Sequence, residues 1–61
     1  MAKYRYRKFP MGCYADEKDT LKYICTLHKS GDNWIAKDQG VYGSGKTRDQ
    51  AVDDFLKNRQ E

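Results

Sequence analysis

The chain has 61 residues, of which 38% are hydrophobic and 34% are charged, and its formal net charge is +3. A single domain of this size buries only about 60% of the surface that its unfolded chain exposes. An aromatic fraction of 13% still supplies large side chains for a thin core, which favours a folded domain over a disordered chain. No apolar run is long enough to span a membrane, and two cysteines make no disulfide framework, so we expect a cytoplasmic protein that does not bind membranes.

Positive charge is concentrated at the start of the chain, in residues 1–9. The four basic residues of this segment are Lys3, Arg5, Arg7 and Lys8, and it contains no acidic residue. Tyr4 and Tyr6 alternate with these cations, which predicts either an edge strand or a basic arm. The tyrosines are favoured as core residues because a thin core needs them. In the alternative, the four cations bind the phosphates of a nucleic acid while the tyrosines stack on its bases.

The clearest strand pattern runs from residue 21 to residue 28. Its predicted core face consists of Leu21, Tyr23, Cys25 and Leu27. A turn at residues 30–33 leads to a second strand at 34–39, and Val41 and Tyr42 form a short third strand before a loop at 43–45. Residues 21–45 are therefore predicted to form an antiparallel hairpin or small sheet. The acidic stretch 13–20 is predicted to be a loop that carries Cys13 as a free thiol.

Residues 47–60 are predicted to form a helix. Thr47 is a suitable N-cap, and Gln50 three residues later completes a capping-box pattern. The apolar stripe at helical spacing consists of Ala51, Val52, Phe55 and Leu56. This stripe can cover one face of a small sheet, so the predicted fold class is α+β: a two- to three-stranded antiparallel sheet with one C-terminal helix packed on one face, in a single domain over residues 1–61.

A glycine-rich motif precedes this helix. Residues 40–47 match the pattern G-x-x-x-x-G-K-T of nucleotide-binding loops. The preceding strand is too polar for a central parallel strand, and only 14 residues follow Thr47, which argues against nucleotide hydrolysis. A weaker hypothesis is that the backbone amides at the helix N-terminus bind a phosphate or sulfate. The residues predicted for this anion site are Gly43, Ser44, Gly45 and Lys46.

Catalytic and metal-binding residues are not predicted. His28 is the single histidine, and no nucleophile or carboxylate is placed beside it by the sequence. A structural zinc site needs four ligands, whereas the cysteines and this histidine offer three. We therefore expect no enzyme activity, no metal and no cofactor.

The later two thirds of the chain contain a recognisable order of residues, namely Lys22, Tyr23, Ile24, Trp34, Ile35, Ala36, Lys37, Gly40, Gly45, Thr47 and Ala51. This order resembles the strand-turn-strand-helix segment of HicB-type antitoxins. The chain is also similar to phage restriction-alleviation proteins of the Lar type, which end in a comparable aromatic strand, glycine turn and short helix closing near an asparagine and an arginine, here Asn58 and Arg59. Both resemblances imply a bacterial or bacteriophage protein that binds or antagonises another macromolecule.

The sequence therefore predicts a small non-catalytic regulatory protein that binds a protein partner, as a monomer or weak homodimer. A nucleic-acid-binding module that uses the basic segment is the alternative. The exposed sheet face or edge, together with the acidic loop, would contact the partner.

Overall fold

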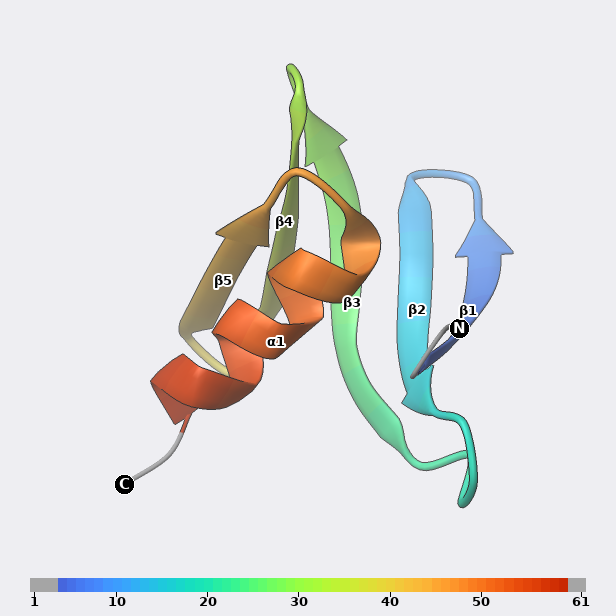
Figure 1. Ribbon diagram of the computed structural model, residues 1–61. Helices are drawn as coiled ribbons and strands as arrows, with labels where there is room; N and C mark the ends of the chain where they lie inside the picture. The colour runs from blue at the N-terminus through green and yellow to red at the C-terminus, as the bar shows by residue number, and fades with distance from the viewer. Residues whose placement is uncertain (1–3, 60–61) are drawn as a thin grey trace.

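The computed structural model describes residues 4–59 and shows an antiparallel sheet followed by a helix (Figure 1). The elements are β1 (Tyr4–Phe9), β2 (Gly12–Glu17), β3 (Tyr23–Ser30), β4 (Asn33–Asp38), β5 (Val41–Gly45) and α1 (Arg48–Arg59). Each strand pairs with its neighbours in sequence, in the order β1-β2-β3-β4-β5. The α+β class and the packed C-terminal helix are confirmed. The predicted number of strands is too low, because the described residues form a five-stranded sheet.

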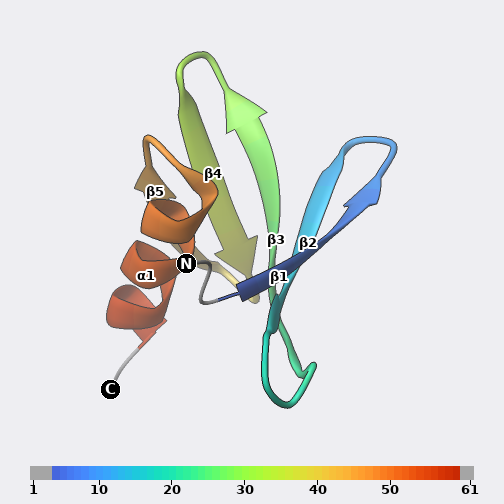
Figure 2. The ribbon, with the colours of Figure 1, turned by 45° about the vertical axis from the view of Figure 1, so that its right-hand side comes forward.

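The helix covers one face of the sheet and leaves the other face bare (Figure 2). Its contacts are most numerous with β5, then β4 and β3. The core between helix and sheet is small, and its buried side chains are Cys13, Ala15, Ile24, Cys25, Leu27, Ala36, Ala51, Val52 and Phe55. Most of these sheet residues are small, which lets the helix backbone approach closely. No helix in the described part of the chain has the length and apolar character needed to cross a membrane.

The strand β2 replaces the loop predicted at residues 13–20. Its residues Cys13 and Ala15 are buried against the helix side, while Asp16 is only 2% exposed. Aspartate is depleted in strands, and that depletion is why this stretch reads as a loop. Here Arg7 of the neighbouring strand binds the carboxylate, so the strand tolerates it. Cys13 is a free thiol, as predicted, but it is buried.

A β-bulge changes the predicted core face of β3. Ala15 pairs with Cys25 while the next residue, Asp16, pairs with Tyr23, so Ile24 is an extra residue in β3. Ile24 therefore turns towards the helix and is buried. Leu21 and Tyr23, predicted to face the core, are 53% and 46% exposed, so that prediction is wrong.

The helix begins as the sequence predicts. The backbone N–H of Gln50 donates to Oγ1 of Thr47 at 3.1 Å, and Oε1 of Gln50 accepts from the N–H of Lys46 at 3.0 Å. These bonds satisfy donors that a helix N-terminus leaves unpaired. The loop predicted at 43–45 is instead the end of β5, which enters the helix through a short connection.

Candidate binding surface

One row of side chains crosses the bare face of the sheet from edge to edge. The cross-strand partners that make this row are Arg7, Tyr14, Thr26, Lys37 and Tyr42, one from each strand. Directly paired residues in antiparallel strands point to the same face, so we call this set the cross-sheet row. Phe9 and Tyr23 lie on the same face, beside Tyr14. Half of the aromatic side chains of the chain are therefore on the face that the helix leaves uncovered.

At the β1 end, the row is rigid and its charge is compensated. Nε and Nη2 of Arg7 donate to the two carboxylate oxygens of Asp16 at 2.6 and 2.9 Å. This carboxylate raises the pKa of Arg7. The guanidinium lies 5.0 Å from the centre of the Tyr14 ring, and Phe9 stacks on the same ring at 4.5 Å. The two parallel hydrogen bonds to Asp16 fix the position of the Arg7 guanidinium. A partner would therefore meet a planar group stacked on Tyr14, with its charge already compensated.

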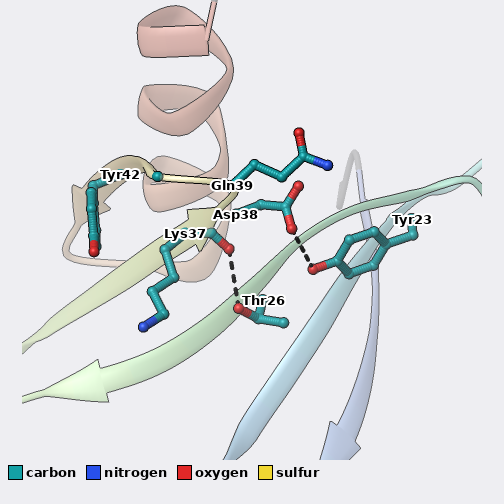
Figure 3. Close-up of a pocket in the computed structure, with 7 residues that line it drawn as sticks. Tyr23, Thr26, Lys37, Asp38, Gln39 and Tyr42 are labelled. Atoms are coloured by element: carbon teal, nitrogen blue, oxygen red, sulfur yellow. Dashed lines mark hydrogen bonds between the residues drawn. The ribbon is translucent and has the colours of Figure 1, made fainter.

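At the β5 end, the row borders a shallow hollow of about 290 Å³ (Figure 3). Tyr23 and Tyr42 stand on opposite sides of it, with Thr26 and Lys37 between them. The hydroxyl of Tyr23 donates to Asp38 at 3.2 Å, and burial together with this carboxylate raises the pKa of Tyr23 to about 12. Tyr42 is 58% exposed, so its ring is available to a partner. Aromatic side chains are enriched at protein contact surfaces relative to the rest of the protein surface.

The basic residues of the N-terminal segment do not gather on one face. Arg5 and Arg7 belong to the bare face, whereas Lys8 pairs with Cys13 and belongs to the helix side. Lys3 lies outside the described residues. The predicted patch of four cations is therefore not assembled by the residues that the structure describes.

The tyrosines of β1 tie this strand to the helix. The hydroxyl of Tyr4 donates to Asp53 and that of Tyr6 donates to Asp49. Two residues along a strand span about 7 Å and four residues along a helix span about 6 Å, so the two pairs match in spacing. Burial and the neighbouring carboxylate raise the pKa of both tyrosines above its usual range. Both rings also pack against the core, which leaves them unavailable for stacking on bases.

A side chain in the first turn of α1, Arg48, also contacts aromatic rings of β1 and β4 on the face that the helix covers. The guanidinium of Arg48 lies 4.7 Å from the ring centre of Tyr6 and 5.6 Å from that of Trp34. These cation–π contacts link β1, β4 and the first turn of α1.

The two edges of the sheet differ. At β5, the N–H of Ser44 donates to Oδ2 of Asp54 at 3.0 Å, and the carbonyl oxygen of Tyr42 accepts from Nδ2 of Asn58 at 2.7 Å. The helix thus caps two outward backbone groups of β5, the N–H of Ser44 and the C=O of Tyr42. Among residues 4–59, no comparable bond reaches the backbone of β1 from outside the sheet.

The residues predicted for an anion site lie in β5 and its connection to α1. The N–H of Ser44 is already bound to Asp54, and that of Lys46 is bound to Gln50. Gly43 and Gly45 face the helix at close range. A carboxylate at this position disfavours an anion, so the geometry gives the hypothesis no support, and phosphate titration remains its test.

The cysteines and the histidine are separated. Cys25 is fully buried, and burial followed by the charge of Asp38 raises the pKa of its thiol to about 11. His28 pairs with Ile35 in the row next to the cross-sheet row. Among the described residues, no three histidine, cysteine or acidic side chains come close enough together to hold a metal ion.

Sequence reasoning missed the cross-sheet row. Period-two patterning assigns faces within one strand, but aligning Tyr14, Lys37 and Tyr42 needs the register of all five strands and the position of the bulge. The exposed Tyr42, beside a glycine turn, was the available local signal.

Comparison with protein families, with curated proteins and with solved structures finds no match to this chain.

Proposed function

We propose that this chain is a small non-catalytic binding protein whose partner is another protein and whose contact surface is the cross-sheet row. The observation that carries the proposal is the alignment of fixed Arg7, stacked Tyr14 and exposed Tyr42 on a face without a helix. Tyrosine and arginine are the residues most enriched at the energetic centres of protein interfaces. A regulatory role of the antitoxin-like or host-modulating kind is part of the same proposal.

The chemistry of the hollow supports binding rather than catalysis. Its one carboxylate, Asp38, accepts the Tyr23 hydroxyl, whose raised pKa keeps it protonated, and the Thr26 hydroxyl donates to the carbonyl oxygen of Lys37, so neither hydroxyl is paired with a base that could activate it as a nucleophile at neutral pH. Catalysis by side chains requires a nucleophile or base held within hydrogen-bonding distance of a second group. A shallow surface with two tyrosines and a lysine suits recognition of a partner side chain.

The test is affinity capture from a nuclease-treated lysate of the source organism, with quantitative mass spectrometry. The double variant Lys37→Ser/Tyr42→Ser removes the exposed end of the row without touching the core, and Lys57→Ser on the exposed side of α1 is the matched control. We expect a partner that wild type and the control capture and that the double variant captures at least tenfold less. Equal capture by all three proteins would contradict the proposal.

A second candidate function is the binding of single-stranded nucleic acid. The observation that favours it is Lys37 between the exposed rings of Tyr23 and Tyr42, because aromatic rings stack on unpaired bases. Arg7 is already paired with Asp16 and so is not available to a phosphate, which places this candidate second.

Fluorescence anisotropy with a labelled mixed-sequence oligonucleotide tests this candidate. Binding should weaken steeply between 50 and 200 mM salt, as phosphate contacts require, and Tyr42→Ala should weaken it about 5- to 150-fold, the range of one stacked base. No binding at low salt, or binding that Tyr42→Ala leaves intact, would remove it.

A further inference from the structure

The backbone groups that point outward from β1 can be identified from its hairpin. Phe9 pairs with Gly12 across a two-residue turn, so this closing pair is hydrogen-bonded and the pairs alternate from there. The N–H and C=O groups of Tyr4, Tyr6 and Lys8 therefore face away from β2. The same counting from the Asp38–Val41 pair places Tyr42 and Ser44 outward in β5. Those are the two residues that the helix caps, which supports the counting.

The outward edge of β1 is both uncapped and positively charged. Arg5 and Lys8 make no hydrogen bond or ion pair with any residue from 4 to 59, and β1 contains no acidic residue. Acidic side chains do lie near its N-terminal half, where Asp49 and Asp53 accept the tyrosine hydroxyls. Asp16 lies directly opposite Arg5, but its carboxylate is already bound by Arg7. The net positive charge that remains is therefore at Arg5 and towards the hairpin, at Lys8.

Charge decides between the occupants that an open edge can take. A second copy of the chain would place β1 beside β1 and bring arginines and lysines together, which is unfavourable for directly opposed residues. A nucleic acid has no backbone pattern that continues a β-ladder. An extended peptide with acidic side chains satisfies both the backbone groups and the free cations.

We propose that the β1 edge binds an extended acidic segment of a partner protein, which adds to the sheet as a sixth strand. The proposal rests on the proposed function in taking a protein as the partner, but it uses the edge rather than the cross-sheet row. Acidic side chains of the added strand would lie beside Arg5 on the bare face and beside Lys8 on the helix side. Pro10 ends the ladder, so a segment of about six residues, roughly 20 Å long, matches β1.

The test is amide hydrogen exchange measured by NMR on ¹⁵N-labelled protein, with a synthetic peptide of glutamate and valine that presents glutamate on both faces of an extended strand. At a peptide concentration ten times its dissociation constant, exchange of the outward Tyr6 and Lys8 amides should slow about tenfold. The Ser44 amide, already bonded to Asp54, is the internal control and should not change. A peptide with lysine in place of glutamate is the charge control and should have no effect.

Two variants at one position separate the backbone donor from the charge. Lys8→Thr removes the charge alone, whereas Lys8→Pro also removes the outward N–H, a change that an edge strand tolerates. We expect Lys8→Thr to weaken peptide binding and Lys8→Pro to weaken it about fivefold more, the effect of one net hydrogen bond. Circular dichroism confirms that both variants remain folded.

Four results would overturn the inference. These are unchanged exchange with the glutamate peptide, equal slowing with the lysine peptide, slowing that depends on protein concentration without peptide, and slowing produced by an oligonucleotide. The third result would identify a second copy as the occupant and the fourth a nucleic acid. If the hydrogen-exchange test shows no peptide binding at the β1 edge while the Lys37→Ser/Tyr42→Ser variant still loses its captured partner, the proposed function stands without this inference.

Discussion

Replacing Gly43 in β5 with alanine should strongly destabilise the protein. A Cβ atom at this position would lie 2.2 Å from the backbone N and 2.5 Å from the Cα of Phe55, and 2.8 Å from the carbonyl oxygen of Ala51. Carbon atoms pack at about 3.5 Å or more, so α1 must move by roughly 1 Å away from β5. The obstacle is helix backbone, which no side-chain rotation relieves.

The size of the effect follows from the packing. Overpacking a core costs about 1–3 kcal/mol, and a clash with backbone belongs at the upper end. A 61-residue domain has a total stability of roughly 3–9 kcal/mol at typical values per residue. We therefore expect Gly43→Ala to lose at least a third of the free energy of unfolding.

Urea unfolding followed by Trp34 fluorescence measures this loss. With a slope near 1 kcal/mol per molar urea, the midpoint should fall by about 3 M. Gly31→Ala is the matched control, since Gly31 has φ +62° and open space around its Cβ position. That variant carries only the left-handed backbone penalty of about 1 kcal/mol. A midpoint for Gly43→Ala no lower than that of the control would refute the reasoning.

Three further predictions concern an ion pair, an edge and a thiol. Arg7→Ala leaves the buried Asp16 carboxylate without its partner and should lower stability by about 1–3 kcal/mol in urea unfolding at pH 7; an unchanged midpoint would contradict it. Asp54→Ala/Asn58→Ala uncaps β5, and sedimentation velocity should show more association than wild type at equal concentration, whereas identical profiles would argue against a capping role. Burial raises the pKa of Cys25 from 9.0 to about 11, so the protonated thiol adds stability that is full below pH 9 and is lost as pH rises to 11. Cys25→Ala should reduce the slope of the unfolding free energy against pH over this interval, most clearly between pH 9 and 10, below the ordinary pKa of tyrosine, and an equal slope would contradict this.

The helix could be predicted because its signals are local. Thr47 and Gln50 lie three residues apart at its start, and the apolar stripe that includes Phe55 repeats at helical spacing. Neither signal depends on where the rest of the chain lies. The predicted boundaries therefore agree with α1 to within one residue over the described part of the chain.

The second strand could not be predicted because its favourable interactions come from elsewhere. Asp16 suggests a loop until Arg7, nine residues earlier, is placed beside it by the β1–β2 register. The bulge at Ile24 likewise reverses the face of Tyr23, and Leu21 lies before β3 begins; alternation alone cannot show either. Both features arise from strand pairing, which is a tertiary property.

The candidate surface could be predicted only in its composition. The sequence supplies exposed tyrosines and cations, but the cross-sheet row exists because Tyr14, Thr26 and Lys37 pair across neighbouring strands. To predict that the two edges differ, one must also know how α1 packs, because Asp54 and Asn58 reach the backbone of β5 from that helix.

A sheet with one capped edge and one open edge can accept an added strand at the open edge only. After a strand docks on β1, the assembly grows further only if the newcomer brings a free edge of its own, because Asp54 and Asn58 block growth at β5. Fibres require every subunit to offer two complementary ends. Within residues 4–59 the sheet offers a single open edge, so its architecture favours a discrete complex and opposes runaway polymerisation.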